Sequence, residues 1–218
     1  MLSHQEARKF YDRFGSKVDS QAFYEDPATS ELLARGDFDR ARAVFEFGCG
    51  TGRFAERLLA RHLPPGSRYV AVDLSSTMIA LAKQRLSHWG ARAQVRLSDG
   101  SPKLDEPESG FDRFVSNYVL DLLSVDDIRV LLGEARRVLS PQGLLCLVSL
   151  TEGATVLSRA VTRVWKRVHA VRPSLVGGCR PLEMALFLTP SVWQVRHRRV
   201  VTAFGISSEV VVAAPLSR

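Results

Sequence analysis

One stretch decides the fold of this chain: Val44-Phe45-Glu46-Phe47-Gly48-Cys49-Gly50-Thr51-Gly52-Arg53-Phe54. A short apolar run ends in glycines at alternate positions, and a segment with apolar residues at helical spacing follows. Glycine permits a tight turn, and it lets a ligand approach the backbone where a Cβ would clash. A helix that begins after such a turn presents free N–H groups to an anionic group. The stretch therefore predicts a strand, a ligand-binding turn and a helix, in that order.

Strand-like and helix-like segments alternate on both sides of this stretch, which is typical of a parallel sheet covered by helices. A turn is predicted at Pro141-Gln142-Gly143, and an antiparallel strand pair is predicted around the short connection Gly205-Ile206-Ser207-Ser208. The strands that we expect are residues 43–47, 69–72, 93–97, 111–116, 144–150, 194–202 and 209–214.

Composition excludes several classes of protein. The chain has 218 residues, of which 45% are hydrophobic and 24% charged, as in an ordinary folded domain. Its longest apolar run, residues 143–150, is far shorter than the roughly 20 residues of a membrane-spanning helix, and its first residues are polar and charged. We therefore expect a cytoplasmic protein. The three cysteines are widely spaced and suggest neither a disulfide framework nor a metal site.

The formal net charge of +7 fits an anionic substrate, an anionic membrane surface or nucleic acid, or no specific partner at all. Much of this charge lies in one predicted helix, where an apolar stripe that includes Trp165 runs beside a basic face. Such a helix could rest on an anionic membrane. The favoured interpretation is that its apolar stripe packs on the sheet and its basic face lies in water. The basic residues are Arg159, Arg163, Lys166 and Arg167.

An acid at the end of the second predicted strand supports a ligand-binding site. Asp73 follows Val70-Ala71-Val72, and a carboxylate at this position can accept hydrogen bonds from both hydroxyls of a ribose. The alternative is a helix N-cap or a solvated loop residue. Together with the glycine turn upstream, Asp73 favours the ribose role.

The glycine spacing discriminates between cofactors. Nicotinamide-binding folds prefer G-x-G-x-x-G, whereas here the glycines fall at 48, 50 and 52 after Glu46. This pattern resembles the E/D-x-G-x-G-x-G motif of the class I S-adenosylmethionine-dependent methyltransferases. The resemblance continues over roughly residues 40–150 in the family's order. The matching segments are Asp73-Leu74-Ser75-Ser76-Thr77-Met78, Ser98-Asp99-Gly100, Phe111-Asp112 leading to Asn117, and Arg136-Arg137-Val138-Leu139-Ser140-Pro141-Gln142-Gly143-Leu144.

The resemblance implies an α/β fold of Rossmann-like type: a seven-stranded, mostly parallel sheet with an antiparallel last strand and helices on both faces. We expect a single methyltransferase domain over residues 1–218. Within it, residues 1–40 would form an N-terminal helical lid and residues 41–150 the cofactor-binding core. Residues 151–218 would supply substrate-side helices and the terminal strand pair.

The resemblance also implies S-adenosylmethionine as the cofactor, with S-adenosylhomocysteine as the product. The glycines would let the methionine part of the cofactor lie on the backbone, and Glu46 would orient that part. Asp73 would hold the ribose, Met78 would pack on the adenine, and Asp99 would accept a hydrogen bond from the adenine amine. Met78 is equally plausible as a core residue. The implied cofactor-binding residues are Glu46, Gly48, Cys49, Gly50, Gly52, Asp73, Leu74, Met78, Asp99, Gly100 and Asn117.

Methyl transfer from a sulfonium depends mainly on orientation and desolvation, and a base is needed only if the nucleophile must lose a proton. The candidate catalytic residues are His169 as that base, Asn117 where the methyl group would point, and Tyr11. A lone histidine is more often structural, and Asn117 could simply form a loop. The candidate lid aromatics are Tyr11, Phe14, Phe23 and Tyr24, with the loop 172–181 as a further contributor.

Within the class, the chain resembles the branch of small-molecule methyltransferases typified by ubiquinone and menaquinone biosynthesis (methyltransferase types 11 and 25). Phe10-Tyr11-Asp12-Arg13-Phe14 and the pattern Asp73-x-Ser75-x-x-Met78 carry this resemblance. The longer quinone-specific signatures are absent, so a quinone is not implied. We expect a small, hydrophobic or lipid-like acceptor.

Three alternatives remain open. A nucleic-acid methyltransferase fits the charge, but Ser116-Asn117-Tyr118-Val119 stands where an Asn-Pro-Pro-Tyr type motif would be expected. A non-enzymatic S-adenosylmethionine-binding protein would keep the same glycines and acids. A nicotinamide-dependent oxidoreductase is disfavoured by the glycine spacing. No obligate protein partner is inferred.

Overall fold

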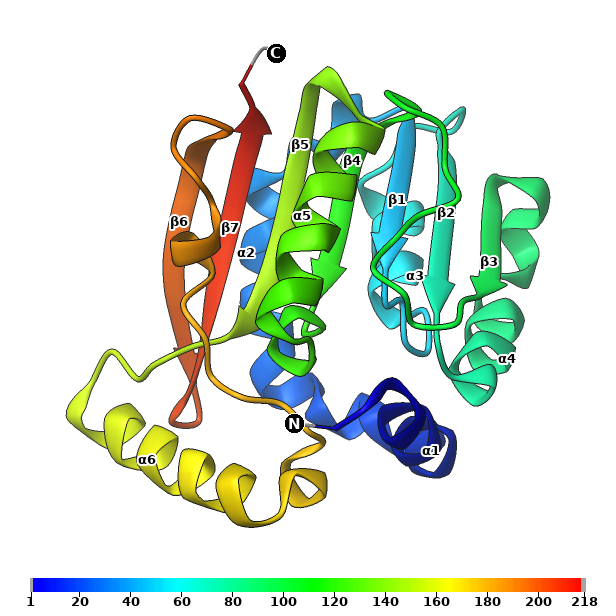
Figure 1. The fold of residues 1–218 in the computed structure, drawn as a ribbon. Helices are drawn as coiled ribbons and strands as arrows, with labels where there is room; N and C mark the ends of the chain where they lie inside the picture. Colours follow the sequence, from blue (N-terminus) through cyan, green and yellow to red (C-terminus); the bar gives the residue numbers. More distant parts are fainter. Residues whose placement is uncertain (1, 217–218) are drawn as a thin grey trace.

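The computed structural model describes residues 2–216, in which one sheet lies between layers of helices (Figure 1). Along the chain the elements are α1 (His4–Phe14), α2 (Ala22–Arg35), β1 (Ala43–Phe47), α3 (Arg53–Arg61), β2 (Arg68–Asp73), α4 (Ser76–Arg85), β3 (Ala93–Leu97), β4 (Phe111–Asn117), α5 (Val125–Val138), β5 (Leu139–Leu150), α6 (Val156–Val171), β6 (Trp193–Ala203) and β7 (Ile206–Pro215).

The seven strands in this part of the chain follow the order β3-β2-β1-β4-β5-β7-β6. Strands β1 to β5 pair in parallel, and β7 enters antiparallel between β5 and β6. The order reverses between β1 and β4, where open α/β sheets bind ligands outside the carboxyl ends of their strands. The predicted sheet, mostly parallel with a reversed last strand, is confirmed.

Amphipathic helices cover both faces of the sheet, as predicted. On one face, α5 places Ile128, Leu131 and Ala135 in one buried cluster with Phe45 and Phe114 of the strands. The spacing of these helical residues, i, i+3 and i+7, forms a single apolar stripe. Helices α2, α3 and α4 cover the other face (Figure 1). The central strands are therefore buried on both sides, which explains the nearly continuous apolar runs in β1 and β5, whereas the edge strands β3 and β6 are mostly exposed.

Two predicted connections differ in the structure. Strand β5 begins at Leu139, directly after α5, so Pro141-Gln142-Gly143 lies within the strand rather than in a turn before it. The register with β4 shifts there, since Phe111 pairs with Leu139 and Arg113 with Leu144. A bulge tolerates a proline because the missing N–H is not needed for pairing.

The terminal hairpin is tighter than predicted. Strands β6 and β7 are joined by only Phe204 and Gly205, and the residues predicted to connect them, 206–208, belong to β7. Both turn residues have positive φ, 51° and 79°. This is the signature of a two-residue turn whose twist matches that of the flanking strands.

The N-terminal segment is only partly a cover. Helix α2, predicted within the lid, is part of the core, because Ala28 and Leu32 are completely buried and the helix packs on β5, β6 and β7. Helix α1 lies at the edge where the parallel strands end (Figure 1). Its first turn is closed by a capping box between Ser3 and Glu6.

Helix α6 also lies beyond the carboxyl edge of the parallel strands (Figure 1). The side that it buries carries Ser158 and Thr162, whereas Val156, Leu157 and Val164 of the predicted apolar stripe are exposed. The stripe therefore packs on the protein only in part, through Val161, Trp165 and Val168, which are half-buried, while the basic face lies in water as expected. In the described residues, no helix has the length and apolar character needed to cross a membrane.

Candidate active site

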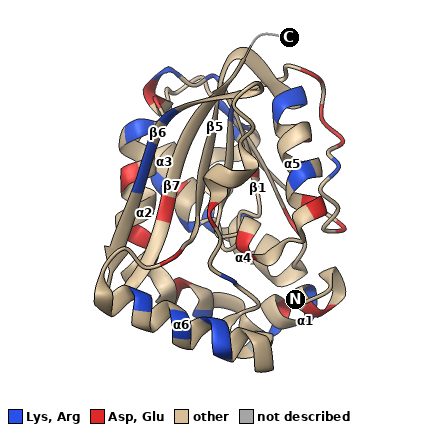
Figure 2. Cartoon of the chain, turned by 60° about the vertical axis from the view of Figure 1, so that its left-hand side comes forward, with Lys and Arg blue, Asp and Glu red and all other residues tan. Residues whose placement is uncertain are grey.

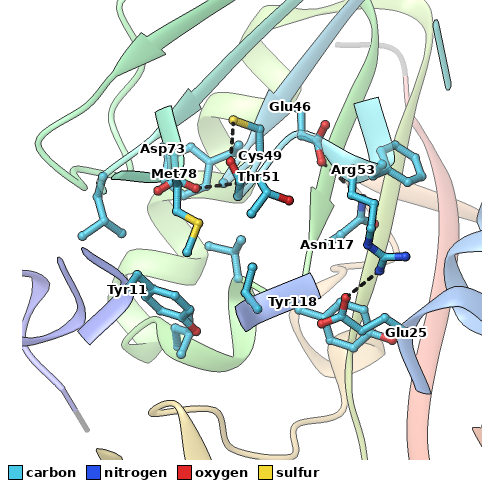
Figure 3. A pocket seen from close by; sticks show the side chains of 18 of the residues that line it. Tyr11, Glu25, Glu46, Cys49, Thr51, Arg53, Asp73, Met78, Asn117 and Tyr118 are labelled. Atoms are coloured by element: carbon cyan, nitrogen blue, oxygen red, sulfur yellow. Dashed lines mark hydrogen bonds and ion pairs between the residues drawn. The ribbon is translucent and has the colours of Figure 1, made fainter. Parts of the chain in front are cut away.

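A large pocket opens at the carboxyl ends of β1, β2 and β4 (Figure 3). Helix α1, the glycine turn, the start of α2 and the residues after β4 form its walls. Its cavity volume is about 160 Å³, and its mouth is open to solvent.

The glycine turn joins β1 to α3 at the pocket wall. Gly48 and Gly50 have φ values of 82° and 52°, which other residues rarely adopt. A Cβ on Gly50 would meet no described atom within 4 Å, so this glycine leaves the backbone open toward a ligand, whereas a Cβ on Gly48 would overlap Val119. Gly52 serves packing instead, because its Cβ would lie 3.2 Å from the Cα of Ala82 in α4. Gly52 does not line the pocket.

Asp73 lies at the end of β2 and ties the glycine turn to α4. One carboxylate oxygen accepts a hydrogen bond from the Gly50 N–H and the other from the Ser75 N–H, both at 2.9 Å. Burial raises the pKa of the Asp73 carboxyl, and these two backbone donors oppose the shift. Each oxygen keeps a second acceptor site. Asp73 can therefore hold the turn and still accept hydrogen bonds from a ribose.

Glu46 lines the pocket although it is almost completely buried. The Tyr69 hydroxyl donates a hydrogen bond to one Glu46 oxygen, and the Asn117 amide donates to the other at 3.4 Å. Burial raises the pKa of Glu46 to about 7. Asn117 lines the pocket, and its buried Oδ1 has no hydrogen-bond partner among the described residues. Glu46 thus orients an amide whose buried Oδ1 is left without a protein partner beside the pocket.

Most of the other predicted cofactor-binding residues line the same pocket: Cys49, Leu74, Met78 and Gly100. Met78 is also buried against the core, so its position fits either of the roles weighed from the sequence. Asp99 does not line the pocket. Its exposed carboxylate accepts a hydrogen bond from the Ser101 N–H at 2.8 Å.

Only some of the aromatic residues predicted to form a lid over the acceptor line the pocket. Tyr11 and Tyr24 line the pocket, whereas Phe14 and Phe23 do not; Phe23 packs against Tyr24 and Phe204. The loop 172–181 contributes Cys179 to the lining.

His169 stands outside the pocket. Its Nε2 lies 3.1 Å from the Gly178 carbonyl oxygen, and burial lowers its pKa. A role as base therefore has no direct geometric support, because α6 turns this ring toward the loop backbone.

Five charged residues that line the pocket were not predicted as site residues: Asp19, Glu25, Asp26, Arg53 and Arg57. Glu25 of α2 and Arg53 of α3 form an ion pair at 3.1 Å, and Asp26 pairs with the same guanidinium (Figure 3). Burial raises the pKa of Glu25 to about 7, although Arg53 acts to lower it. Arg57 shares Asp26 at 3.0 Å. Arg53 directly follows the glycine motif, and this position could have indicated that it lies at the site. Nothing near Glu25 in the sequence indicated that it would pair with Arg53.

Two acidic residues, Asp12 and Asp19, attach α1 and the segment before α2 to the rest of the chain. Asp12 of α1 accepts hydrogen bonds from the Ser75 hydroxyl at 2.6 Å and the Thr77 N–H at 3.2 Å, at the start of α4. Asp19 accepts a hydrogen bond from the Thr51 hydroxyl at 2.6 Å and pairs with Arg85 at 2.7 Å. The segment before α2 is thereby anchored to the glycine turn and to α4.

Comparison with known proteins agrees with this geometry. Residues 44–143 match the family model described as a methyltransferase domain. The chain is 27% identical over 173 residues to the malonyl-[acyl-carrier protein] O-methyltransferase of Erwinia pyrifoliae, covering 79% of this chain and 60% of that protein. It is 33% identical over 120 residues to the trans-aconitate 2-methyltransferase of an Azoarcus species, covering 55% and 44%. The chain thus spans less than two thirds of the length of either relative.

Among solved structures, that of the [4+2]-cyclase SpnF superposes with a TM-score of 0.73 at 16% identity, covering 99% of this chain and 98% of the other. At this level of identity the similarity concerns the fold.

Proposed function

We propose that this chain, which contains a class I S-adenosylmethionine-dependent methyltransferase domain, transfers the methyl group of S-adenosylmethionine to a small hydrophobic acceptor. The predicted family, fold and cofactor are confirmed. The roles of individual residues and the acceptor are the parts that we propose.

The observation that carries the proposal is the composition of the pocket beyond the glycine turn. Its wall there is mainly apolar and aromatic, and the half-buried carboxylate of Glu25 lies in it beside Arg53, with Asp19, Asp26 and Arg57 as the other charged lining residues (Figure 3). Such a wall favours a hydrophobic acceptor with one polar group. The apolar and aromatic lining residues are Leu2, Ala7, Tyr11, Tyr24, Tyr118, Val119, Leu122, Leu123 and Cys179.

The cofactor half of the pocket fits S-adenosylmethionine. Gly50 leaves the backbone open, and the free Oδ1 of Asn117 can accept a hydrogen bond from the ammonium group of the methionine part. Asp73 has acceptor sites left for the ribose hydroxyls, and Leu74 and Met78 offer an apolar surface for the adenine. The predicted Asp99 contact remains a proposal, and it would require the loop after β3 to turn this carboxylate toward the adenine.

Bound S-adenosylmethionine supplies a methyl group on a sulfonium, which an in-line nucleophile displaces to leave S-adenosylhomocysteine. The protein therefore has to orient the acceptor, exclude water and take up any proton released. Tyr11 and Tyr118 narrow the pocket from two sides, and the Tyr118 hydroxyl is held at 2.9 Å from that of Ser208. These contacts keep the aromatic wall rigid.

Glu25 is the group that we propose as proton acceptor for a hydroxyl nucleophile. It lines the pocket, and a pKa near 7 suits a base at neutral pH. Arg53 restrains the carboxylate at 3.1 Å and stabilises its charged form. When the acceptor oxygen bonds to the methyl carbon, its proton passes to Glu25. His169, the base predicted from the sequence, lies outside the pocket and would need a water chain to reach it.

An acidic acceptor is the second candidate. Arg53 and Arg57 both line the pocket, and the relatives named above act, by their names, on malonyl-[acyl-carrier protein] and trans-aconitate. A carboxylate is already ionised at neutral pH and would need no base. The effect of changing Glu25 therefore separates the two acceptor classes.

The experiment is a screen for S-adenosylhomocysteine release with panels of hydrophobic alcohols and phenols, carboxylic acids and RNA. We expect turnover with the first panel, and a loss of about 10²-fold or more in kcat for Glu25→Gln. Glu31→Gln is the matched control, because Glu31 lies on the same helix but pairs with Arg35 and Arg199 outside the pocket.

Turnover with the carboxylic acids alone, with no effect of Glu25→Gln, would refute the hydrophobic acceptor and favour the acidic acceptor. Turnover with RNA alone would favour the nucleic-acid reading. Binding of S-adenosylmethionine without release in any panel or in cell extract would refute methyl transfer and leave a binding protein.

A further inference from the structure

Helix α6 has three distinct faces, and only one of them contacts the rest of the chain. On the protein side, Ser158 and Thr162 are buried. The Trp165 Nε1 donates a hydrogen bond to the Cys179 carbonyl at 2.9 Å, and the His169 Nε2 lies 3.1 Å from the Gly178 carbonyl. These polar contacts, together with the half-buried side chains of Val161 and Trp165, attach the helix to the loop beside the pocket and to the β6–β7 turn. An amphipathic helix in a globular protein normally turns its apolar stripe inward.

The second face is apolar and exposed to solvent. Val156, Leu157, Val164 and Val171 have exposed fractions of 86%, 69%, 61% and 80%. Successive residues turn by about 100° along an α-helix, so these four side chains and Ala160 share one side of it. A continuous apolar strip on a water-soluble surface marks an interaction site.

The third face is basic and flanks the apolar strip. It carries Arg159, Arg163, Lys166 and Arg167, and residues 156–172 contain no acidic residue. Figure 2 shows the basic positions along α6. Among the described residues, Lys166 alone of the four forms an ion pair, with Glu152.

We propose that α6 docks this chain on an anionic lipid surface, with its apolar strip inserted among the lipid chains and its basic face against the headgroups. The juxtaposition of an exposed apolar strip with a basic flank is the pattern of an interfacial helix. The charge on the helix complements that of an anionic headgroup layer. The proposal depends on the surface of α6 and not on methyl transfer.

Other occupants fit this surface less well. A second copy of the chain in a two-fold dimer would place the basic faces of two α6 helices near each other, and like charges would repel. Nucleic acid would pair with the arginines but would leave the apolar strip in water. A lipid surface satisfies both faces at once.

Docking through α6 would bring the pocket close to the lipid. The loop that α6 holds includes Cys179, which lines the pocket, and Gly177, whose carbonyl lies 3.4 Å from the Tyr11 hydroxyl. One continuous chain of contacts therefore runs from α6 through this loop to α1. A hydrophobic acceptor could reach the pocket from the lipid without crossing water.

The test is co-sedimentation of the full chain with vesicles of phosphatidylcholine, alone or mixed with phosphatidylglycerol. We expect the wild-type chain to bind the mixed vesicles and to bind those of phosphatidylcholine weakly. Leu157→Ser/Val164→Ser should lower the partition coefficient by at least about tenfold, because both side chains lose burial in lipid. The control is Leu97→Ser/Leu186→Ser, at positions that are also exposed but lie on other elements.

A second variant removes charge from the basic face. Each basic residue near an anionic surface contributes roughly a fivefold gain in binding, so removing three should cost about a hundredfold. Added salt should weaken the wild type in the same direction. The variant is Arg159→Gln/Arg163→Gln/Arg167→Gln. Its control removes three exposed arginines elsewhere, Arg40→Gln, Arg61→Gln and Arg129→Gln.

Three results would overturn the proposal: equal binding to both kinds of vesicle, absence of binding to either, or loss of binding in the control variants to the same extent as in the α6 variants. A dimer that becomes monomeric in Leu157→Ser/Val164→Ser, without vesicle binding by the wild type, would assign the strip to a second copy instead. All the substituted side chains are exposed, so the fold should persist, and circular dichroism verifies this.

Discussion

Asp73 offers a sharp test of the cofactor site, because the structure gives it a structural and a proposed binding role that can be measured separately. Its two oxygens hold the N–H groups of Gly50 and Ser75. In Asp73→Ala these two buried donors lose their partner, at a cost of about 1–3 kcal/mol each. We therefore expect the free energy of unfolding to fall by roughly 2–6 kcal/mol.

The binding role has its own magnitude. Two ribose hydroxyls donating to a carboxylate contribute about 1.5–3 kcal/mol each. Loss of both should raise the Kd of S-adenosylhomocysteine by about a hundredfold or more. Isothermal titration at a temperature where the variant is folded measures this change. Asp39→Ala removes an exposed carboxylate outside the pocket and controls for net charge.

A ligand lacking the hydroxyls separates the two roles. The wild-type chain should bind 2′,3′-dideoxy-S-adenosylhomocysteine about a hundredfold more weakly than S-adenosylhomocysteine. Asp73→Ala should bind the two ligands about equally, because the interaction partner is already gone. Equal affinity of the wild-type chain for both ligands would refute the ribose role and leave Asp73 as a purely structural link.

Three further predictions follow from named contacts. Burial raises the pKa of Glu46 to about 7, so its contribution to stability is fully present below its unfolded pKa of about 4.3 and is lost as pH rises through 7. The stability of Glu46→Gln relative to wild type should therefore increase by on the order of 3 kcal/mol from about pH 4 to about pH 8. A pH-independent difference between the two in urea unfolding would contradict this. Gly48→Ala should cost about 2–5 kcal/mol, because φ is 82° and the new Cβ overlaps Val119; in a Val119→Ala background about 1–2 kcal/mol should remain, and full recovery would show that backbone strain is negligible. Asp12→Ala should release α1 from α4, speed proteolysis of residues 4–14 and raise the Kd of S-adenosylmethionine about fivefold, whereas unchanged proteolysis would show that other contacts hold α1.

Much of the fold could be predicted because its signals are local. Residues 43–47 and 93–97 were predicted as strands with the observed bounds. The first is a short apolar run that is buried in the sheet, which is the local signal of a parallel strand. The glycine turn was equally readable, because the positive φ values at Gly48 and Gly50 restrict which residues can stand there. The local signal was misleading at Pro141, where a turn was predicted. Pro141 lies in a bulge of β5, and the strand that pairs with β5 there begins 30 residues earlier.

The acceptor side of the site could not be predicted in the same way. The Glu25–Arg53 pair joins α2 to α3 across 28 residues of chain, and no pattern near either residue indicates the other. The same holds for Asp12 and its contacts at the start of α4. Raised pKa values at Glu25 and Glu46 depend on burial, which exists only after the helices have packed on the sheet.

By itself, the sequence determined the α/β architecture, the glycine turn and the choice of cofactor, because strand length, helical period and glycine spacing are properties of neighbouring residues. Only the tertiary structure decided which acids meet which bases in the pocket and which face of α6 meets the protein. Periodicity shows that a helix is amphipathic, but Ser158 and Val164 differ in burial because of what lies beside each of them in space. No local pattern contains this information, and in this chain Val156, Leu157 and Val164 of the apolar stripe are left in contact with water.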